Sequence, residues 1–587
     1  MKRFMLFPLF GMLLLSCQRS EPFTGEESGG SSAEPAAGLY LAVQFKTGNN
    51  SGTRADETYP PGTYDGYEDG QEHENNVSLV RFFFFDSNGN PARVGGGESA
   101  ASWIDRVPAS QGGSIPEETV EKIVEATLEL RVERRSDLPA QVLAVLNPSD
   151  DVKRLTAPSM AEIRQVVADF KTGLMGKTDR YSDKDFVMSN TVYLSNDKRI
   201  METIQIPSDR YYPTAAEAAK NPVVIYVERV LARLDFGFGS NLEAVRLPDG
   251  TTGYLTTEAD SDDDAPNTQA AGDPIYARVL SWDVLDDPDQ SRLLKSIHPE
   301  WPENHFGEDY NQRWNTADYR RCFWAINPPA NRFGYRECSY NEIREKGLEL
   351  PNHLGYTTIY LQENAAPLEN LNGAPVRPTR IVVAAELVNS EGKPVSVAMW
   401  GGKRYTYEGL KNALASAVNA DGKLYKRTET ATKTTFTPFY PEDFELQEQE
   451  GKVYPRLTAA AETKTWSAGN QIESAPYADA AAVNAYLAGV AGNIQLWKEG
   501  KTTYQFAIRH LGAQDTPGYY GIVRNHIYRA TVNRIHGFGT PVYDPDKPVE
   551  YPKEEEPELV TGALGISVKI LQWRIVSQEY DLTWPAD

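Results

Sequence analysis

Leu39-Tyr-Leu-Ala-Val-Gln-Phe-Lys46 alternates apolar and polar residues without a break. A period of two residues is typical of a β-strand that buries one face and exposes the other. The sequence therefore predicts an amphipathic strand near the start of the chain. The side chains expected on its buried face belong to Leu39, Leu41, Val43 and Phe45.

An export signal precedes this strand. Lys2 and Arg3 are followed by an apolar run, Phe4 to Leu15, which is too short to span a membrane. The run ends in Leu-Leu-Ser-Cys17, which resembles the lipobox of bacterial lipoproteins. We expect Cys17 to be the lipid attachment site and residues 18–38, rich in Gly, Ser and Glu, to be a tether. An ordinary signal peptide with a chance cysteine is the alternative.

A polar loop follows the strand and contains Thr53-Arg54-Ala55. Proteolysis between Arg54 and Ala55 would detach the strand and leave an open groove in its sheet. Lys46 is a rival cleavage point, but it lies at the end of the strand and should be less accessible.

Composition limits the class of protein. The 587 residues predict two to four domains, and their 45 Gly, 38 Pro and 31 Tyr favour β-sheet with many turns. The net charge of −23, with no basic block, argues against nucleic-acid binding.

The pattern along the chain is mostly that of strands. Val223 to Phe238 is a long β-branched run that we expect to end a first domain. Helical spacing is restricted to a few short segments, among them residues 157–170, 410–418 and 475–488. Further strands are expected at residues 77–86, 127–133, 141–147, 276–285, 380–388, 395–400, 494–497, 503–509 and 526–535.

The C-terminus carries a second amphipathic strand behind an acidic, proline-rich spacer. The spacer, residues 541–559, should be extended and stand away from an acidic body. The apolar positions then change phase, which predicts two strand segments joined by a bulge. A tethered strand of this kind must dock in its own sandwich or in a neighbour's. Its apolar residues are Ile566, Val568 and Ile570, then Leu571, Trp573 and Ile575.

The sequence offers almost no motif of a catalytic, phosphate-binding or metal-binding site. Gly173 to Thr178 looks like a phosphate loop but is two residues short, and no zinc-protease, C-x-x-C or G-x-S-x-G motif occurs. We therefore predict no catalytic residue, no metal and no cofactor. Cys322 and Cys338 are a candidate disulfide of an exported protein, with two free thiols as the alternative.

Several segments together resemble the Bacteroidetes fimbrillins, or type V pilins, and among these the major subunit of short, Mfa-type fimbriae. They are the Cys17 lipobox, Thr53-Arg54-Ala55, the strand at 77–86, Arg524-Asn-His-Ile-Tyr528 and the end from Ile570 to Leu582. The likeness is strongest in the C-terminal third and loosest at residues 241–370.

The resemblance implies a mostly β fold, with two transthyretin-like Greek-key β-sandwich domains, a few short helices and a C-terminal donor-strand extension. The implied divisions are a signal peptide (1–17), a propeptide (18–54), an N-terminal domain (55–240), a C-terminal domain with insertions (241–540) and the spacer with its donor strand (541–587).

The resemblance also implies a sequence of export, cleavage and assembly. A lipidated precursor reaches the outer membrane, an Arg-specific protease cuts after Arg54, and the C-terminal strand fills the groove of the next copy in a surface fimbria that supports adhesion. Expected partners are further copies, anchor and tip subunits, the protease, and host or bacterial surface ligands. Two alternatives remain: an uncut, lipid-anchored accessory subunit, and a glycan-binding lipoprotein that stacks sugars on aromatic residues in 286–340.

Overall fold

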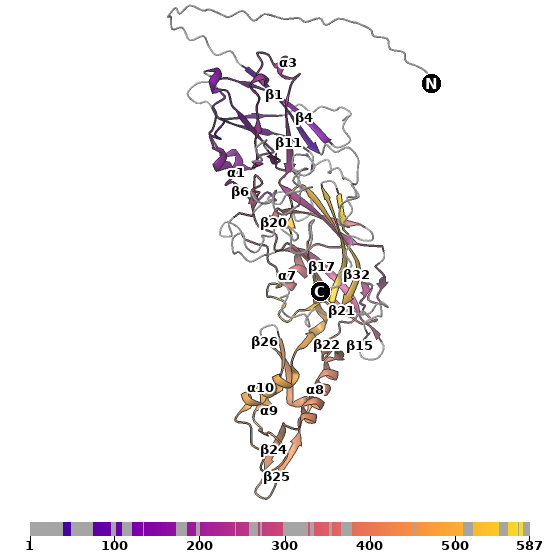
Figure 1. Cartoon of the computed structure of the whole chain (residues 1–587). Helices are drawn as coiled ribbons and strands as arrows, with labels where there is room; N and C mark the ends of the chain where they lie inside the picture. Colours follow the sequence, from indigo (N-terminus) through magenta and orange to yellow (C-terminus); the bar gives the residue numbers. More distant parts are fainter. Residues whose placement is uncertain are drawn as a thin grey trace, which may run out of the picture.

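A computed structural model describes the residues whose ranges are given at the end of this paragraph. They are mostly β-strands with a few short helices, which confirms the expected fold class. Figure 1 shows three parts in succession, with strand β1 at one end and a lobe containing α8 and α10 at the other. The described residues are 39–48, 74, 76–95, 101–107, 120–132, 134–171, 185–194, 200–240, 242–257, 268–269, 273–297, 327–328, 334–350, 355–365, 378–449, 452–508, 521–550, 562–572 and 575–578.

The first part is built on an eight-stranded sheet. Strand β10 (Ile204–Gln205) pairs with β5 beside the main path of the sheet. The other strands are, in spatial order, β3 (Trp103–Arg106), β2 (Val80–Phe85), β5 (Gln141–Leu146), β7 (Met188–Asn190), β11 (Val223–Arg229), β1 (Leu39–Gly48) and β4 (Val120–Leu130).

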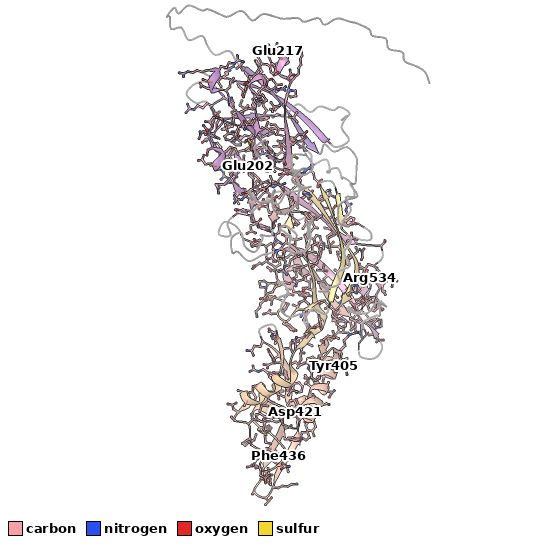
Figure 2. The ribbon with its side chains drawn as sticks, in the orientation of Figure 1. Glu202, Glu217, Tyr405, Asp421, Phe436 and Arg534 are labelled. Carbon is pink, nitrogen blue, oxygen red and sulfur yellow. The ribbon has the colours of Figure 1, made fainter. Side chains whose placement is uncertain are left out.

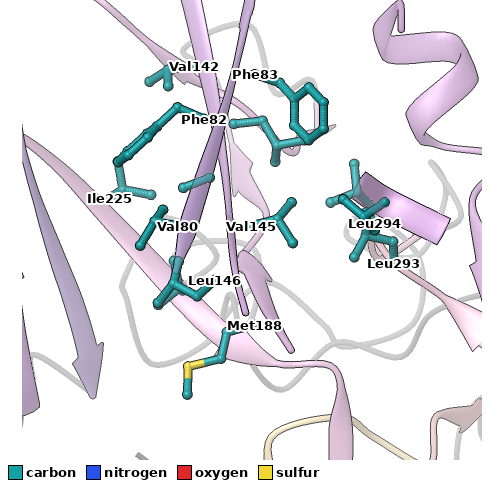
Figure 3. Packing of buried hydrophobic residues seen from close by; sticks show 14 of the residues in the cluster. Val80, Phe82, Phe83, Val142, Val145, Leu146, Met188, Ile225, Leu293 and Leu294 are labelled. Atoms are coloured by element: carbon teal, nitrogen blue, oxygen red, sulfur yellow. The ribbon is translucent and has the colours of Figure 1, made fainter. Parts of the chain in front are cut away.

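This sheet has side chains packed on both of its faces. All six residues of β2 and all six of β5 are buried, so these strands are apolar without alternation, apart from Arg81 and Gln141. Figure 3 shows Phe82 and Phe83 of β2 beside side chains from β5, β7 and β11. Leu293 and Leu294, from much later in the chain, complete the same cluster and join the first part to the second.

The second part contains two sheets that share one core. Their buried side chains, including Phe236, Trp282 and Tyr528, form a single cluster. One sheet runs β19 (Tyr356–Gln362), β12 (Leu231–Phe238), β32 (His526–Gly537), β34 (Gly562–Gln572) and β35 (Ile575–Gln578). The other runs β13 (Ala244–Arg246), β14 (Thr252–Leu255), β17 (Tyr276–Leu285), β21 (Arg380–Val388), β30 (Lys501–Ala507) and β33 (Thr540–Pro541).

The third part, which we call the lobe (residues 397–497), is inserted between two paired strands. Strands β21 and β30 are hydrogen-bonded neighbours, and the chain between them leaves the sheet and forms a core of its own. The lobe is entered through β22 (Val397–Trp400) and left through β29 (Ile494–Trp497), which pair with each other. Tyr405, Asp421 and Phe436 mark it in Figure 2.

Two helices give the lobe its core. Helix α8 (Tyr407–Asp421) begins at Thr406, whose hydroxyl accepts from the Gly409 N–H, and ends at Gly422 in the left-handed conformation. Helix α10 (Ala480–Ala491) begins at Asp479 in the same manner. The remaining elements of the lobe are β23 (Lys403–Thr406), β24 (Tyr425–Glu429), β25 (Thr434–Pro438), β26 (Phe444–Gln449), β27 (Lys452–Leu457), α9 (Ala459–Glu462) and β28 (Thr465–Ser467).

Short elements complete the first two parts. Strand β6 (Val167–Ala168) of the first part pairs with β18 (Ser291–Arg292) of the second. The others are α1 (Asp150–Lys153), α2 (Met160–Ile163), α3 (Ala215–Ala218), α7 (Tyr340–Lys346), and the pairs β8 (Tyr193–Leu194) with β9 (Ile200–Met201), β15 (Thr268–Gln269) with β16 (Asp273–Pro274), and β20 (Asn364–Ala365) with β31 (Gly521–Ile522).

Two local expectations differ from the structure. The helix expected at residues 157–170 is only the single turn α2, and the chain then enters β6. The run from Val223 to Phe238 is two strands in different sheets, because the chain passes from the first sheet to the second at Val230. Period and β-branching indicate a strand but do not indicate which sheet it joins. The change of sheet therefore precedes the domain boundary expected at 240, and the proposed divisions stay predictions.

Candidate strand-exchange site

Strand β1 lies inside the first sheet, between β11 and β4. It pairs with β4 in antiparallel fashion from Leu39 to Gly48, and with β11 in parallel from Val43 to Thr47. Before the parallel ladder begins, Tyr40 and Tyr212 exchange both backbone hydrogen bonds, at 2.7 and 3.0 Å. Hydrogen bonds therefore hold the strand from both sides.

The faces of β1 follow the predicted alternation where its side chains are described. Leu41 and Val43 are buried in the first core and Leu39 packs against its edge. On the opposite face Ala42 is buried as well, and helix α3 packs against this strand. For Phe45 the structure describes the backbone alone.

The chain after the predicted cleavage point is anchored between the first two parts. Cys17, Arg54 and Ala55 lie outside the described residues, which end at Gly48 and resume at Glu74. The buried carboxylate of Glu74 accepts a hydrogen bond from the Tyr360 hydroxyl at 2.6 Å, and its carbonyl accepts from Arg229 Nε at 2.9 Å. A cut after Arg54 would therefore separate β1 from a chain that is held at Glu74.

The predicted donor strand lies on one of the two sheets in the second part of its own chain. Strand β34 pairs with β32 along its whole length, and β35 pairs back on β34. Ile566, Val568 and Ile570 are the register partners of three residues of the second core, which are Val532, Ala530 and Tyr528. The structure thus does not bring the two amphipathic strands together within one chain.

The expected bulge between two strand segments is wrong. Strand β34 keeps its register from Ile566 to Gln572, and the chain then reverses into β35, where Ile575 lies opposite Leu571. The change of apolar phase therefore marks a reversal of direction. Trp573 lies outside the described residues.

The remaining sequence-predicted residues do not form a chemical site. Cys338 is buried and forms no disulfide with any described residue. Burial raises the pKa of its thiol, and its Sγ lies 3.9 Å from Asp283 Oδ2. Cys322 lies outside the described residues, so the disulfide stays a prediction. Within the described ranges, no three His, Cys, Asp or Glu side chains are grouped as a metal site, and no helix has the length and hydropathy to cross a membrane.

Sequence reasoning missed a buried network of charges where the first two parts meet. Arg524 donates to Glu363 Oε2 at 2.6 Å and to the carbonyls of Leu293 and Arg292 at 2.8 and 2.7 Å. Lys295 donates to Glu228 on β11 at 3.0 Å. The only signal for this network in the sequence is the presence of charged residues beside apolar runs.

Comparisons with known proteins agree with the strongest part of the resemblance. Residues 495–579, from β29 to β35, match the family model described as the C-terminal region of fimbrillin, the type IV major fimbrial subunit protein. No curated protein matches the chain.

Three of the solved structures to which the chain is similar come from two organisms. A fimbrilin from Porphyromonas gingivalis shares 12% identity, with 92% of this chain and 98% of that one covered, at a TM-score of 0.32. The C-terminally truncated tip fimbrial protein Mfa3 of the same organism shares 11%, with 92% and 99% covered, at 0.31. A proposed cell adhesion protein from Parabacteroides distasonis shares 12%, with 94% and 99% covered, at 0.37.

The match over β29 to β35 lies in the C-terminal third, where the sequence resemblance is strongest. Over this segment the chain is similar to fimbrial subunit proteins. The narrower likeness to the major subunit of short fimbriae stays a prediction. Residues 495–579 are similar to the C-terminal region of fimbrillins, and over this segment the resemblance to that family is confirmed.

Proposed function

We propose that this chain is a structural subunit of a surface fimbria, exported as a lipoprotein precursor, cut after Arg54 and polymerised by strand exchange. The observation that carries the proposal is the position of β1 between β11 and β4. Among the described ladders, β4 pairs with β1 alone. Loss of β1 would therefore leave unpaired backbone on two strands at once, and such a slot must be refilled.

The C-terminal strand has the pattern that the slot requires. Leu39, Leu41, Val43 and Phe45 occupy four alternate positions of β1. Leu564-Gly-Ile-Ser-Val-Lys-Ile570 places Leu, Ile, Val and Ile at the same spacing. Ser567 then corresponds to Ala42, so a small residue is kept at the position packed near α3.

The exchange roughly conserves backbone hydrogen bonds. On its own sheet β34 pairs with β32 and β35, and in the slot it would pair with β11 and β4. Strand β32 keeps β12 as its other neighbour when β34 leaves. The slot between β11 and β4 exists only after β1 has been removed. Removal of β1 therefore determines that β34 leaves its own sheet and enters the slot of another copy.

The experiment is to treat purified precursor with an Arg-specific protease and to look for SDS-resistant ladders. We expect ladders from the wild type, a mature N-terminus at Ala55, and no ladder from Arg54→Ala. Val568→Asp should abolish the ladder, because it would place a charge among the apolar positions. Lys569→Asp adds the same carboxylate on the other face and is the matched control. Correctly cut protein that stays monomeric would contradict the proposal.

The same experiment separates the alternatives. An uncut accessory subunit would retain its lipid at Cys17, and Arg54→Ala would then change nothing. For the glycan-binding alternative, most of the aromatic residues in 286–340 lie outside the described residues, and Tyr340 is buried in the second part. No structural observation favours that alternative.

A further inference from the structure

The beginning of the acidic spacer lies on the body of the protein. We call residues 540–550 the strap. Its first residues, Thr540 and Pro541, pair with β30, and the Val542 N–H donates to the Lys501 carbonyl at 3.3 Å. The expectation that the whole spacer stands away from the body is therefore wrong for this part. The prolines remove N–H donors from the strap, but its carbonyls still accept hydrogen bonds.

Helix α7 holds the middle of the strap. Asn341 donates from its backbone N–H to the Pro545 carbonyl at 2.9 Å, and from Nδ2 to Asp546 Oδ1 at 2.7 Å. The Val549 N–H donates to the Cys338 carbonyl at 3.0 Å. Val542 and Val549 also pack against the apolar cluster around Tyr340 and Ile343.

A buried arginine fixes the end of the strap. Arg380 Nη2 donates to the Val549 carbonyl at 2.7 Å, and Nη1 donates to the Glu550 carbonyl at 3.2 Å. Asp286 orients the guanidinium by accepting from Nε at 2.7 Å. Gln505 Nε2 adds a further bond to the Glu550 carbonyl at 3.3 Å. A planar guanidinium with several fixed donors suits this task, and a lysine would not reproduce it.

We propose that the strap is the fixed base from which the C-terminal strand reaches a second copy of this chain, and that Arg380 is the positioning residue that sets this base at Glu550. The inference rests on the proposed function, since it concerns how far the donor strand extends. Only residues 551–561 then separate the base from Gly562. Fully extended, they span at most about 40 Å, whereas a spacer free from residue 541 would span at most about 75 Å.

The test compares spacer lengths in the ladder assay with full-length precursor. Deletion of Glu554–Glu556 should reduce ladder formation at least ten-fold, because it removes three of the residues that bridge the gap. Replacement of these three residues by Gly-Ser-Gly keeps the length and should preserve assembly. Unchanged assembly after the deletion would overturn the proposal, because a spacer free from residue 541 would tolerate it.

Hydrogen exchange gives a second readout that does not depend on the spacer. The amides of Val542 and Val549 should be protected in the monomer and equally protected in the polymer. Loss of that protection on assembly would show that the strap is released, and would overturn the proposal.

Arg380 is tested with a conservative variant and a milder second one. Arg380→Lys should speed exchange at the Val549 amide and slow ladder formation several-fold, while exposed Arg246→Lys should change neither. If Arg380→Lys lowers thermal stability, Asn341→Ala loosens the strap from the surface side and should give the same pair of effects. Faster exchange with unchanged assembly in either folded variant would overturn the role of the strap. A wild-type protein that is cut but forms no ladder would instead overturn the proposed function.

Discussion

The ammonium of Lys295 lies 3.0 Å from Oε2 of Glu228, and both side chains are fully buried where the first two parts of the molecule meet. Within the described part of the chain, Glu228 Oε1 has no hydrogen-bond partner. Burial raises the pKa of Glu228, and the neighbouring Lys295 and Arg524 oppose that rise. Lys295, in direct contact, and Arg524 thus both favour the charged form of this buried carboxylate.

Replacement of that cation should destabilise the protein strongly. In Lys295→Met, Glu228 loses its nearest positive charge, and a buried charge without its partner typically costs about 3–5 kcal/mol. Its folded-state pKa then lies further above the unfolded value. The protonated carboxyl therefore stabilises the folded state below about pH 4.3, and this contribution is lost as the pH rises through the folded pKa. Urea unfolding at pH 8 and pH 5 should show the larger loss at pH 8.

The matched control is Lys393→Met, which removes an exposed lysine paired with Glu391. Exposed pairs contribute about 0–1 kcal/mol, so this variant should unfold almost as the wild type does. The double variant Lys295→Met/Glu228→Leu should recover much of the lost stability, because no buried charge remains. A Lys295→Met protein as stable as the control would contradict this account of the junction.

Two glycines with nearly equal backbone angles allow a steric cost to be isolated. Gly500 has φ +70° and Gly422 has φ +69°, so alanine is strained at both. A Cβ at Gly500 would lie 2.3 Å from the Leu387 carbonyl oxygen, whereas no atom lies within 4 Å at Gly422. We expect Gly422→Ala to cost roughly 1–2 kcal/mol and Gly500→Ala clearly more. Equal shifts in the unfolding temperatures of the two variants would show that the backbone at Gly500, just before β30, does not pack tightly against Leu387 of β21.

High pH should destabilise the fold through buried tyrosines. Burial raises the pKa of Tyr543 to about 12 and that of Tyr504 further still. Unfolded tyrosine ionises near pH 10, so the stability is complete below pH 10 and is lost as the pH rises towards the folded pKa. Each such tyrosine should contribute a slope of roughly 1.4 kcal/mol per pH unit.

Urea unfolding between pH 9 and pH 12 measures that slope. Tyr504→Phe should make it shallower, because Phe cannot ionise in either state. Tyr356→Phe removes the hydroxyl of an exposed tyrosine and controls for the substitution itself. A slope that Tyr504→Phe leaves unchanged would mean that other groups dominate alkaline unfolding.

Alternation was the most informative pattern in the sequence. It predicts a strand at residues 39–46, where β1 runs from Leu39 to Gly48. The strand expected at 380–388, which does not alternate, has the same bounds as β21. Such patterns depend on which side chains meet the core, and that is a local property of a strand. The helix expected at residues 410–418 lies within α8, whose cap residues are Thr406 and Gly422.

The features that position the candidate site could not be predicted from such patterns. The pairing of β1 with both β11 and β4 joins segments far apart in sequence, and periodicity carries no information about partners. Arg380 looked like the first residue of a strand, yet its guanidinium holds the carbonyls of Val549 and Glu550. The proline-rich spacer is expected to be extended, but its described part contains a turn at Pro545-Asp546, where the Lys547 N–H donates to the Asp544 carbonyl at 3.3 Å. The pattern also does not reveal that a surface lies beside it.

The lobe should fold without the rest of the chain. Val397 and Trp497 are cross-strand partners, so its two ends lie side by side, as is usual for an inserted domain. The buried residues of its core, with Leu410, Leu414 and Trp466, all belong to the lobe, and Tyr543 of the strap packs against them. A fragment of residues 397–497 should therefore unfold cooperatively on heating, as measured by circular dichroism.

In that fragment Leu414→Ala should cost about 2–5 kcal/mol of the free energy of unfolding, because it leaves a cavity beside α8. Ser416→Ala, on the exposed side of the same helix, should stay within about 0.5 kcal/mol. A fragment without a cooperative transition would show that the lobe depends on the second part of the molecule for its stability.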